Sequence, residues 1–348
     1  MDNERPGWNG VRCTVAIPVF NRQDLVRRTL DSALAQTLPG LEVLVVDNCS
    51  TDATWDTLQS YAADPRLRLV RNERNVGLFG NFNRCLSLAR GEFLRFLCSD
   101  DRLAPDCLRA EVAVMDRHPE AAMLTTRARH VDEKGRLIRI FAGELPPGVY
   151  DGREATYLGF WLQVFYGKNP FNCPSGVLVR RNAAEAVGLF DVDMQMTGDL
   201  EYYYRLLRHG GLAVMDAVGC DMMLHVAQES THRGYTDKAI TEFYRLIEDH
   251  ADVINQYGSV AQIQRQAISW LYWQQLQAWS VGQKAAPSFR EQRRRSPGYS
   301  RPRAVLGLAG MTWRRGQIKL GQPYPLPFCP RYPLNDVMGL RTQIPANP

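Results

Sequence analysis

The first 101 residues alternate between short continuous apolar runs and segments whose apolar residues recur at helical spacing. Short runs such as LEVLVVD are typical of strands that are buried on both faces of a parallel sheet. The pattern predicts strands at 11–19, 41–47, 66–72 and 92–101, with helices between them at 24–36, 50–63 and 81–89. Strands and helices that alternate in this way indicate a doubly wound α/β sheet.

The pattern becomes less regular after residue 110. Strand-like segments are expected at 121–132, 174–181 and 212–218, and helices at 183–191 and 199–210. Residues 236–284 have apolar residues at helical spacing and predict further helices. From residue 285 onward Pro, Gly and Arg dominate, which indicates a weakly packed tail.

Polar side chains follow all four strands of the first half. Ligands of doubly wound sheets bind beyond the carboxyl ends of the strands, so these side chains are expected to face one crevice. They are Asn21 and Arg22 after the first strand, Asp47 and Asn48 after the second, Arg71 and Asn72 after the third, and Ser99, Asp100 and Asp101 after the fourth.

Charge is distributed unevenly along the chain. The formal net charge is +5, but residues 290–348 carry +9 and the remaining residues carry −4. Whatever the main body binds, it does not bind it through bulk positive charge, and nucleic acid is not an expected partner.

Composition places the chain among ordinary globular proteins, with 45% hydrophobic and 23% charged residues. No apolar run approaches the roughly 20 residues that span a bilayer, and the N-terminal residues MDNERPGWNG show no secretory signal. The eight cysteines form no CxxC pair, so we expect reduced thiols, no structural zinc site and a cytoplasmic location.

Adjacent acids at a strand end are costly to bury without partners, and their oxygens suit Mg²⁺ or Mn²⁺, which also hold phosphates. The sequence contains neither a GxxxxGK[ST] loop nor a GxGxxG turn. A P-loop nucleotide site and a dinucleotide dehydrogenase are therefore not supported.

Five segments in order carry a resemblance to a known family. They are AIPVFNR (16–22), VLVVDNCSTD (43–52), the stretch from RNERN to CSDD (71–101), SGVLVRR (175–181) and GDLEYYYRLLRHGG (198–211). Together they resemble glycosyltransferase family 2, and the resemblance spans roughly residues 11–232. It implies a GT-A fold, a Rossmann-like nucleotide-binding doubly wound sheet, here with a C-terminal helical extension.

The resemblance also implies an activity. Members transfer a sugar, with inversion and with Mn²⁺ or Mg²⁺, from a nucleoside diphosphate sugar to a hydroxyl of a saccharide or lipid-linked acceptor. A UDP-sugar is the first candidate donor, and synthesis of a polysaccharide or cell-surface glycan is the expected setting. The implied division is a donor half (11–110), an acceptor half (111–232), a helical region (233–285) and a basic tail (286–348).

Donor contacts are carried over from the family by position. Asp47 is expected to accept an N–H of the base. The end of the first strand and the segment after the third are expected to line the same pocket; they contribute Pro18, Val19, Asn21 and Arg22, then Asn48, Arg71, Asn75 and Gly77. Asp100 and Asp101 match the position for metal and ribose, with Asp100 as the principal metal ligand.

The chain departs from the family pattern at two positions. Cys98 stands where many members have a further Asp, and a thiol is a poor ligand for a hard cation, so we expect Cys98 to pack. Gly198 replaces the first of two adjacent acids, and Asp199 falls at the position of the catalytic base. Glu201 and Arg205 are four residues apart and are expected to pair on the helix. Alone, Asp199 would also fit a helix N-cap.

Two histidines follow the last strand of the resembling region. His225 is a candidate metal ligand or diphosphate donor, His232 is a weaker one, and either could be merely structural. The aromatics Trp161, Phe165 and Tyr166 could stack on an acceptor or belong to the core.

Other interpretations of the sequence remain open. A noncatalytic protein that binds sugar nucleotides or carbohydrates would explain the two departures, and a sugar nucleotidyltransferase shares an α/β nucleotide-binding architecture. The basic tail is expected either to contact an anionic membrane at its inner face, to form an oligomer contact, or to remain solvated.

Overall fold

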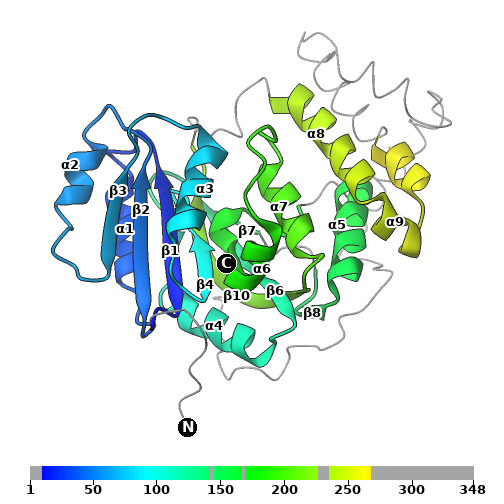
Figure 1. Cartoon of the computed structure of the whole chain (residues 1–348), viewed down its shortest axis with the longest axis horizontal. Helices are drawn as coiled ribbons and strands as arrows, with labels where there is room; N and C mark the ends of the chain where they lie inside the picture. The colour runs from blue at the N-terminus through cyan, green and yellow to red at the C-terminus, as the bar shows by residue number, and fades with distance from the viewer. Residues whose placement is uncertain (1–9, 142–144, 167–168, 226–234, 268–348) are drawn as a thin grey trace.

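The computed structural model describes residues 10–141, 145–166, 169–225 and 235–267. Within these residues the centre of the molecule is a ten-stranded sheet, whose main path runs β3-β2-β1-β4-β9-β6-β10-β5. Helices cover the sheet on both faces, and α8 and α9 lie at the end of the molecule opposite β3 (Figure 1). The expected α/β class is confirmed.

The first half of the sheet is parallel. β1 (Cys13–Val19) pairs with both β2 (Leu41–Asp47) and β4 (Phe93–Phe96), and β2 pairs with β3 (Leu67–Arg71). Every residue of β1 and β2 is buried, as their continuous apolar runs predict for strands covered on both faces.

The intervening helices also match the sequence pattern, although their bounds differ. They are α1 (Val26–Leu34), α2 (Thr54–Gln59) and α3 (Leu78–Leu88). α2 is shorter than predicted, and α3 begins three residues earlier. β4 ends at Phe96, so the acids at 100–101 lie in a turn beyond the strand.

The second half of the sheet is mixed. β9 (Val177–Arg180) lies antiparallel between β4 and β6 (Ala121–Val131), and β10 (Gly211–Met223) runs parallel to β6. Three short strands complete it: β5 (Arg102–Leu103), β7 (Leu137–Phe141) and β8 (Gly148–Tyr150). β9 therefore joins the two halves of the chain into one sheet.

Six further helices complete the described fold. They are α4 (Cys107–Arg117), α5 (Gly152–Tyr166), α6 (Arg181–Val187), α7 (Gly198–Leu206), α8 (Tyr235–Asp249) and α9 (Ala251–Tyr257), with a 3₁₀ turn at Pro174–Gly176. α8 and α9 confirm the helices expected from residue 236, whereas the basic tail lies outside the described residues. No helix in the described ranges has both the length and the apolar character to cross a membrane.

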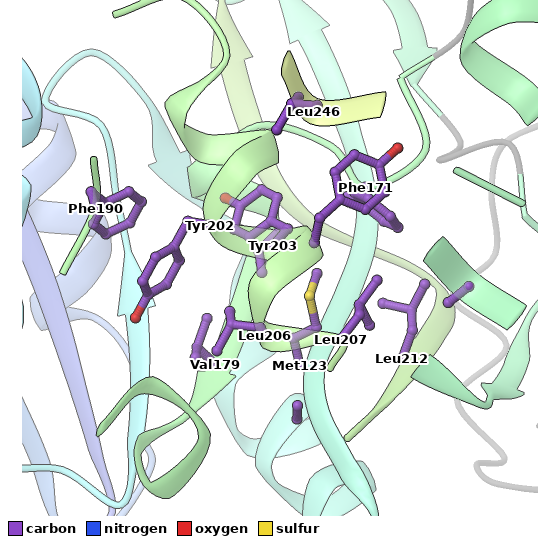
Figure 2. Packing of buried hydrophobic residues seen from close by; sticks show 14 of the residues in the cluster. Met123, Phe171, Val179, Phe190, Tyr202, Tyr203, Leu206, Leu207, Leu212 and Leu246 are labelled. Atoms are coloured by element: carbon purple, nitrogen blue, oxygen red, sulfur yellow. The ribbon is translucent and has the colours of Figure 1, made fainter. Parts of the chain in front are cut away.

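An aromatic core fixes α7 against the sheet and against α5. The three consecutive tyrosines 202–204 are all buried. Tyr202 stacks on Phe190 with ring centroids 3.9 Å apart, and Tyr204 stacks on Phe160 of α5 at 4.4 Å. Figure 2 shows Tyr202 beside Phe190, and Tyr203 among Phe171, Leu206 and Met123. Because large buried side chains contribute most of the burial energy, this cluster holds the start of α7 in place.

The aromatics 161, 165 and 166 belong to the core. Phe165 and Tyr166 are buried, and Trp161 packs against the same cluster with its ring 5.0 Å from that of Tyr166. Of the two interpretations left open by the sequence, the structure supports packing. Cys98 packs against the same cluster, as expected. The seven cysteines of the described chain are free thiols.

Candidate active site

Four asparagines lock the loop after β3 to the end of β2. We call Asn48, Asn72, Asn75 and Asn81 the asparagine network. Asn48 Nδ2 donates to Asn75 Oδ1 at 2.9 Å, and Asn48 Oδ1 accepts from Asn72 Nδ2 at 3.0 Å. Asn72 Nδ2 also donates to Asn81 Oδ1 at 3.0 Å. Since an amide donates and accepts at once, the network satisfies its own buried polar groups.

The network also binds backbone groups around the loop. Asn48 Oδ1 accepts from the Val76 amide at 2.9 Å, and its Nδ2 donates to the Gly77 carbonyl at 3.2 Å. Gly77 has φ +80°, a conformation that favours glycine, and it directly precedes α3. Asn48, Asn75 and Gly77, all expected to line the donor pocket, thus form one rigid unit.

Asp47 lies beneath this edge and is completely buried. Its carboxylate accepts hydrogen bonds from the Ser50 amide and hydroxyl, and it pairs with Arg71 Nε at 3.1 Å. The Arg71 guanidinium lies over the Trp55 ring, 5.3 Å from its centroid. The base of a nucleotide can reach the Asp47 carboxylate only if Ser50 or Arg71 moves. Of Asp47 and Arg71, it is the Arg71 side chain that is exposed to solvent at this edge.

The end of β1 interlocks with the loop after β2. Pro18 and Val19 are strand residues in register with Val46 and Asp47. Asn21 accepts from the Thr51 amide at 2.9 Å, and the Arg22 amide donates to Thr54 Oγ1 at 2.8 Å. The polar residues after β1, β2 and β3 therefore meet at one edge, because these parallel strands are neighbours.

Three large apolar side chains are exposed at this edge: Phe20, Val76 and Leu78 are 39%, 42% and 49% exposed, although β1 and β2 are buried. Phe20 and Val76 lie within the segments 18–22 and 75–77 that the resemblance assigns to the donor pocket, whereas Leu78 was not singled out from the sequence. The available signal was a large apolar residue placed among the polar residues that follow a strand. Together they give the edge apolar surface beside its hydrogen-bonding groups.

The two adjacent acids after β4 have different surroundings. Asp100 Oδ2 lies 2.9 Å from His225 Nε2, just beyond β10. Asp101 is buried; its Oδ2 accepts from the Ser175 hydroxyl at 2.6 Å and its Oδ1 from the Met223 amide at 3.0 Å. Burial and the charge of Asp100 raise the Asp101 pKa. The contacts of Asp101 hold β10 and the 3₁₀ turn beside Asp100.

Asp100 and His225 are the residues that could hold a cation here. No group of three or more His, Cys, Asp or Glu side chains converges on a metal position in the described ranges. One carboxylate and one imidazole fit a divalent ion that takes its remaining ligands from phosphate oxygens and water, as Mg²⁺ commonly does. His232, the other candidate histidine, lies outside the described residues.

Asp199 lies half-buried in the first turn of α7. Its Oδ1 accepts from the Leu200 amide at 2.8 Å. Burial raises the pKa of Asp199 from 3.8 to about 6; the negative charge of Glu242 adds to the rise, and the Leu200 hydrogen bond opposes it. A carboxylate with a pKa close to neutral is suited to accept a proton.

The structure explains why glycine stands at position 198. A Cβ built there would lie 2.6 Å from the Phe79 ring, far inside a normal contact. Phe79 belongs to α3 and packs on Phe190 with ring centroids 5.5 Å apart. The space of the family's first acid is therefore occupied by this aromatic packing.

The expected pairing on α7 is confirmed. Arg205 Nη2 donates to Glu201 Oε2 at 2.7 Å. Arg205 also donates to the carbonyls of Val187 and Leu189, both at 2.8 Å. The pair therefore ties α7 to the end of α6 and leaves Asp199 outside this network.

These features define a class of protein: an α/β nucleotide-binding fold with polar strand ends, an acid–histidine pair and a carboxylate base candidate. Residues 14–188, half of the chain, match the model of glycosyl transferase family 2, and the protein belongs to this family. The resemblance seen in the sequence is confirmed.

Curated relatives match over shorter segments. Succinoglycan biosynthesis protein ExoO of Rhizobium meliloti (strain 1021) is 37% identical over 129 residues, covering 37% of this chain and 36% of the relative. The putative teichuronic acid biosynthesis glycosyltransferase TuaG of Bacillus subtilis (strain 168) is 38% identical over 103 residues, covering 29% and 41%. The chain thus spans less than half the length of these relatives.

Solved structures share the fold at low identity. S. aureus TarS 1–349, crystallised with UDP-GlcNAc, has a TM-score of 0.61 at 18% identity, covering 90% of this chain and 93% of that one. The mannosyltransferase PcManGT of Pyrobaculum calidifontis, in complex with GDP-Man and Mn²⁺, has a TM-score of 0.51 at 17% identity, covering 90% of each. The expected GT-A fold is confirmed.

Proposed function

We propose that the protein is an inverting, metal-dependent glycosyltransferase. It moves a sugar from a nucleoside diphosphate sugar, with a UDP-sugar as the first candidate, to a hydroxyl of a saccharide or lipid-linked acceptor. The observation that carries the proposal is Asp199, a half-buried carboxylate whose pKa is raised to about 6, in a chain that belongs to family 2. Its relatives named for succinoglycan and teichuronic acid biosynthesis favour a polysaccharide or cell-surface product.

The edge formed by β1, β2 and β3 is the proposed donor site. Phe20, Val76 and Leu78 offer apolar surface for a base or ribose, and Arg71 and Arg22 offer positive charge for phosphates. The asparagine network keeps this edge rigid before the donor arrives, which lowers the entropic cost of binding. Binding of UDP-GlcNAc by TarS and of GDP-Man by PcManGT supports the donor class.

Asp100 and His225 are the proposed ligands of Mn²⁺ or Mg²⁺, and Asp101 positions them through Ser175 and β10. A divalent ion bound there would neutralise charge on the departing diphosphate. The Mn²⁺ complex of PcManGT supports a divalent ion in this fold.

Asp199 is the proposed catalytic base. Its carboxylate takes the proton of the acceptor hydroxyl while the hydroxyl oxygen forms a bond to the anomeric carbon. The bond from that carbon to the diphosphate breaks on the opposite face, so the configuration inverts. One displacement needs one base, and the proton ends on Asp199.

The free thiols of the described chain fit a reducing compartment, and we place the protein in the cytoplasm or at the inner face of the membrane. That setting would suit a lipid-linked acceptor.

A screen of nucleoside diphosphate sugars tests the function. Thermal stability is measured with each sugar in the presence of Mn²⁺ or Mg²⁺, and hydrolysis and transfer are followed for those that stabilise the protein. At least one should raise the Tm only with the metal. Stabilisation without hydrolysis or transfer to any acceptor would favour a noncatalytic binding protein. No stabilisation by any sugar would overturn the proposal.

Asp100→Ala tests whether Asp100 is a metal ligand. Calorimetry with the stabilising nucleotide should show tight binding to wild type with Mn²⁺ and none to the variant. Asp216→Ala is the control, because Asp216 is an exposed acid of β10 that pairs with Arg127 away from His225. If Asp100→Ala keeps metal-dependent binding, the metal assignment is wrong.

A further inference from the structure

A carboxylate from α8 lies at the start of α7. Glu242 is only 8% exposed. Its Oε2 accepts from the Met196 amide at 2.9 Å, from the Thr197 amide at 2.8 Å and from Thr197 Oγ1 at 3.0 Å. These donors lie two and three residues before Asp199. One buried carboxylate therefore fixes the chain immediately upstream of the proposed base.

This arrangement differs from an ordinary helix cap, because Glu242 accepts from the amide of the N-cap residue Thr197 and from the amide before it. Helix N-termini leave amides without internal partners, and a side chain of the N-cap residue often accepts from them. Thr197 is the N-cap of α7, yet its side chain makes no cap hydrogen bond and donates to Glu242 instead. The negative charge near the start of α7 comes from Glu242 of α8, which lies 45 residues after Thr197 in the chain. Negative charge near a helix N-terminus is stabilising.

A second ionic contact ties α8 to the same loop. Arg245, one turn after Glu242, pairs with Asp191 at 2.9 Å. α8 thus holds the loop 191–197, which leads into α7, near both of its ends. The two contacts differ in one respect, because Glu242 adds negative charge beside Asp199 whereas the Arg245–Asp191 pair is neutral overall.

We propose that Glu242 is a positioning residue for Asp199: it anchors the loop that carries the base and keeps a negative charge beside it. The inference rests on the base role proposed for Asp199. Glu242 lies beyond residue 188, where the family match ends.

The electrostatic surroundings of Asp199 support this role. Glu242 of α8 and Tyr203 of its own helix interact with it electrostatically, and the Leu200 amide donates to it. Burial is the larger cause of its raised pKa, and the charge of Glu242 acts in the same direction. Removal of that charge lowers the proton affinity of Asp199, which makes it a weaker base and moves its titration to lower pH.

The test is a direct titration of Asp199 in the full-length protein. Side-chain carboxyl carbons of aspartate are followed by ¹³C NMR, and the Asp199 signal is identified by its loss in Asp199→Asn. In Glu242→Gln the side-chain oxygen can still accept from the two amides, but the charge is gone. The titration midpoint of Asp199 should fall below that of wild type.

Two variants make the result specific. Glu242→Asp keeps the charge and should keep the midpoint high, and it remains informative if Glu242→Gln folds poorly. Arg245→Gln loosens the same loop without removing negative charge beside the base, so its midpoint should match wild type. An unchanged midpoint in Glu242→Gln, or an equal fall in Arg245→Gln, overturns the proposal.

Anchoring has its own readout. Hydrogen exchange at the Met196 and Thr197 amides should be at least about 10-fold faster in Glu242→Ala than in wild type, because both lose their acceptor. Unchanged exchange overturns the anchoring. Neither measurement needs turnover, so the two proposals can fail separately. If the protein binds no nucleoside diphosphate sugar, the proposed function is overturned. The coupling between Glu242 and Asp199 is still judged by the titration. In an active enzyme, the acid limb of kcat/KM should move with the NMR midpoint.

Discussion

Two loops of the site are held in place by opposite means. The loop 72–77 is held by the neutral amides of the asparagine network, whereas the loop 191–197, which leads to Asp199, is held by the ions Glu242 and Arg245. Neutral amides do not titrate, so the first loop keeps its geometry across a wide pH range. Ions set the proton affinity of their neighbours. The comparison contrasts a loop whose geometry is held by amides with one in which a charge adds to the effect of burial on the proton affinity of Asp199.

The largest expected effect is on turnover, when the proposed base that follows the charged loop is replaced. Asp199→Asn should lower turnover by about 10²–10⁴-fold, because the amide cannot take the acceptor proton. Donor binding should stay near that of wild type, since the proposed donor edge is formed by β1, β2 and β3 whereas Asp199 belongs to α7. Initial rates and calorimetry with the same donor measure the two. Near-normal turnover in the variant would show that another group is the base.

The neutral loop is tested by Asn48→Ala. The substitution removes four hydrogen bonds that join β2 to the loop 72–77 and should destabilise the protein by about 2–4 kcal/mol. Urea unfolding measures the loss. Asn83→Ala is the matched control, since Asn83 exchanges two hydrogen bonds with the Phe190 backbone and should cost less. Equal losses would show that the four hydrogen bonds of Asn48 stabilise the protein no more than the two of Asn83 do.

Packing at the boundary between the loops is tested by Gly198→Ala. The added Cβ would lie 2.6 Å from the Phe79 ring and should destabilise the fold by about 1–3 kcal/mol. Phe79→Leu removes part of that ring, so the double variant should lose less than the sum of the single changes. Additive losses would place the cost of the alanine elsewhere than at Phe79.

The smallest effect is a pH-dependent difference in stability. The Asp199 pKa is higher in the folded state than its ordinary value of 3.8. The raised pKa means that Asp199 adds fully to the free energy of unfolding below about pH 4, where it is protonated. This contribution is lost as the pH rises through about 6. Asn has no such titration, so the stability of Asp199→Asn should rise relative to that of wild type as the pH is raised from about 4 to about 7.5. Unfolding at both pH values measures this, and parallel curves would contradict it.

Local patterns in the sequence predicted much of the first half. Continuous apolar runs predicted β1 and β2, the segment RLRLVRN predicted β3, and the residues after these strands meet at one edge. The pairing of Glu201 with Arg205 also followed from spacing along one helix. These features depend on periodicity within a few residues, which the sequence displays directly.

Long-range contacts were not visible in the sequence. Glu242 contacts Thr197 across 45 residues, and Asp101 uses both oxygens to accept from Ser175 and Met223, so neither arrangement follows from local pattern. The sequence predicted strands close to β6, β9 and β10 but not their pairing, because β9 pairs with strands far away in the chain. Residues whose roles depend on such contacts need the fold before they can be recognised.

The position of β9 also has a consequence for synthesis of the protein on the ribosome. The chain emerges from its N-terminus, so β4 and β6 both leave the ribosome before β9, which must enter between them. Until then each presents an unpaired strand edge, and such edges invite wrong pairing. The nascent chain is therefore most vulnerable between the emergence of β6 and that of β9, an interval in which a chaperone or a slow codon would have the greatest influence on yield.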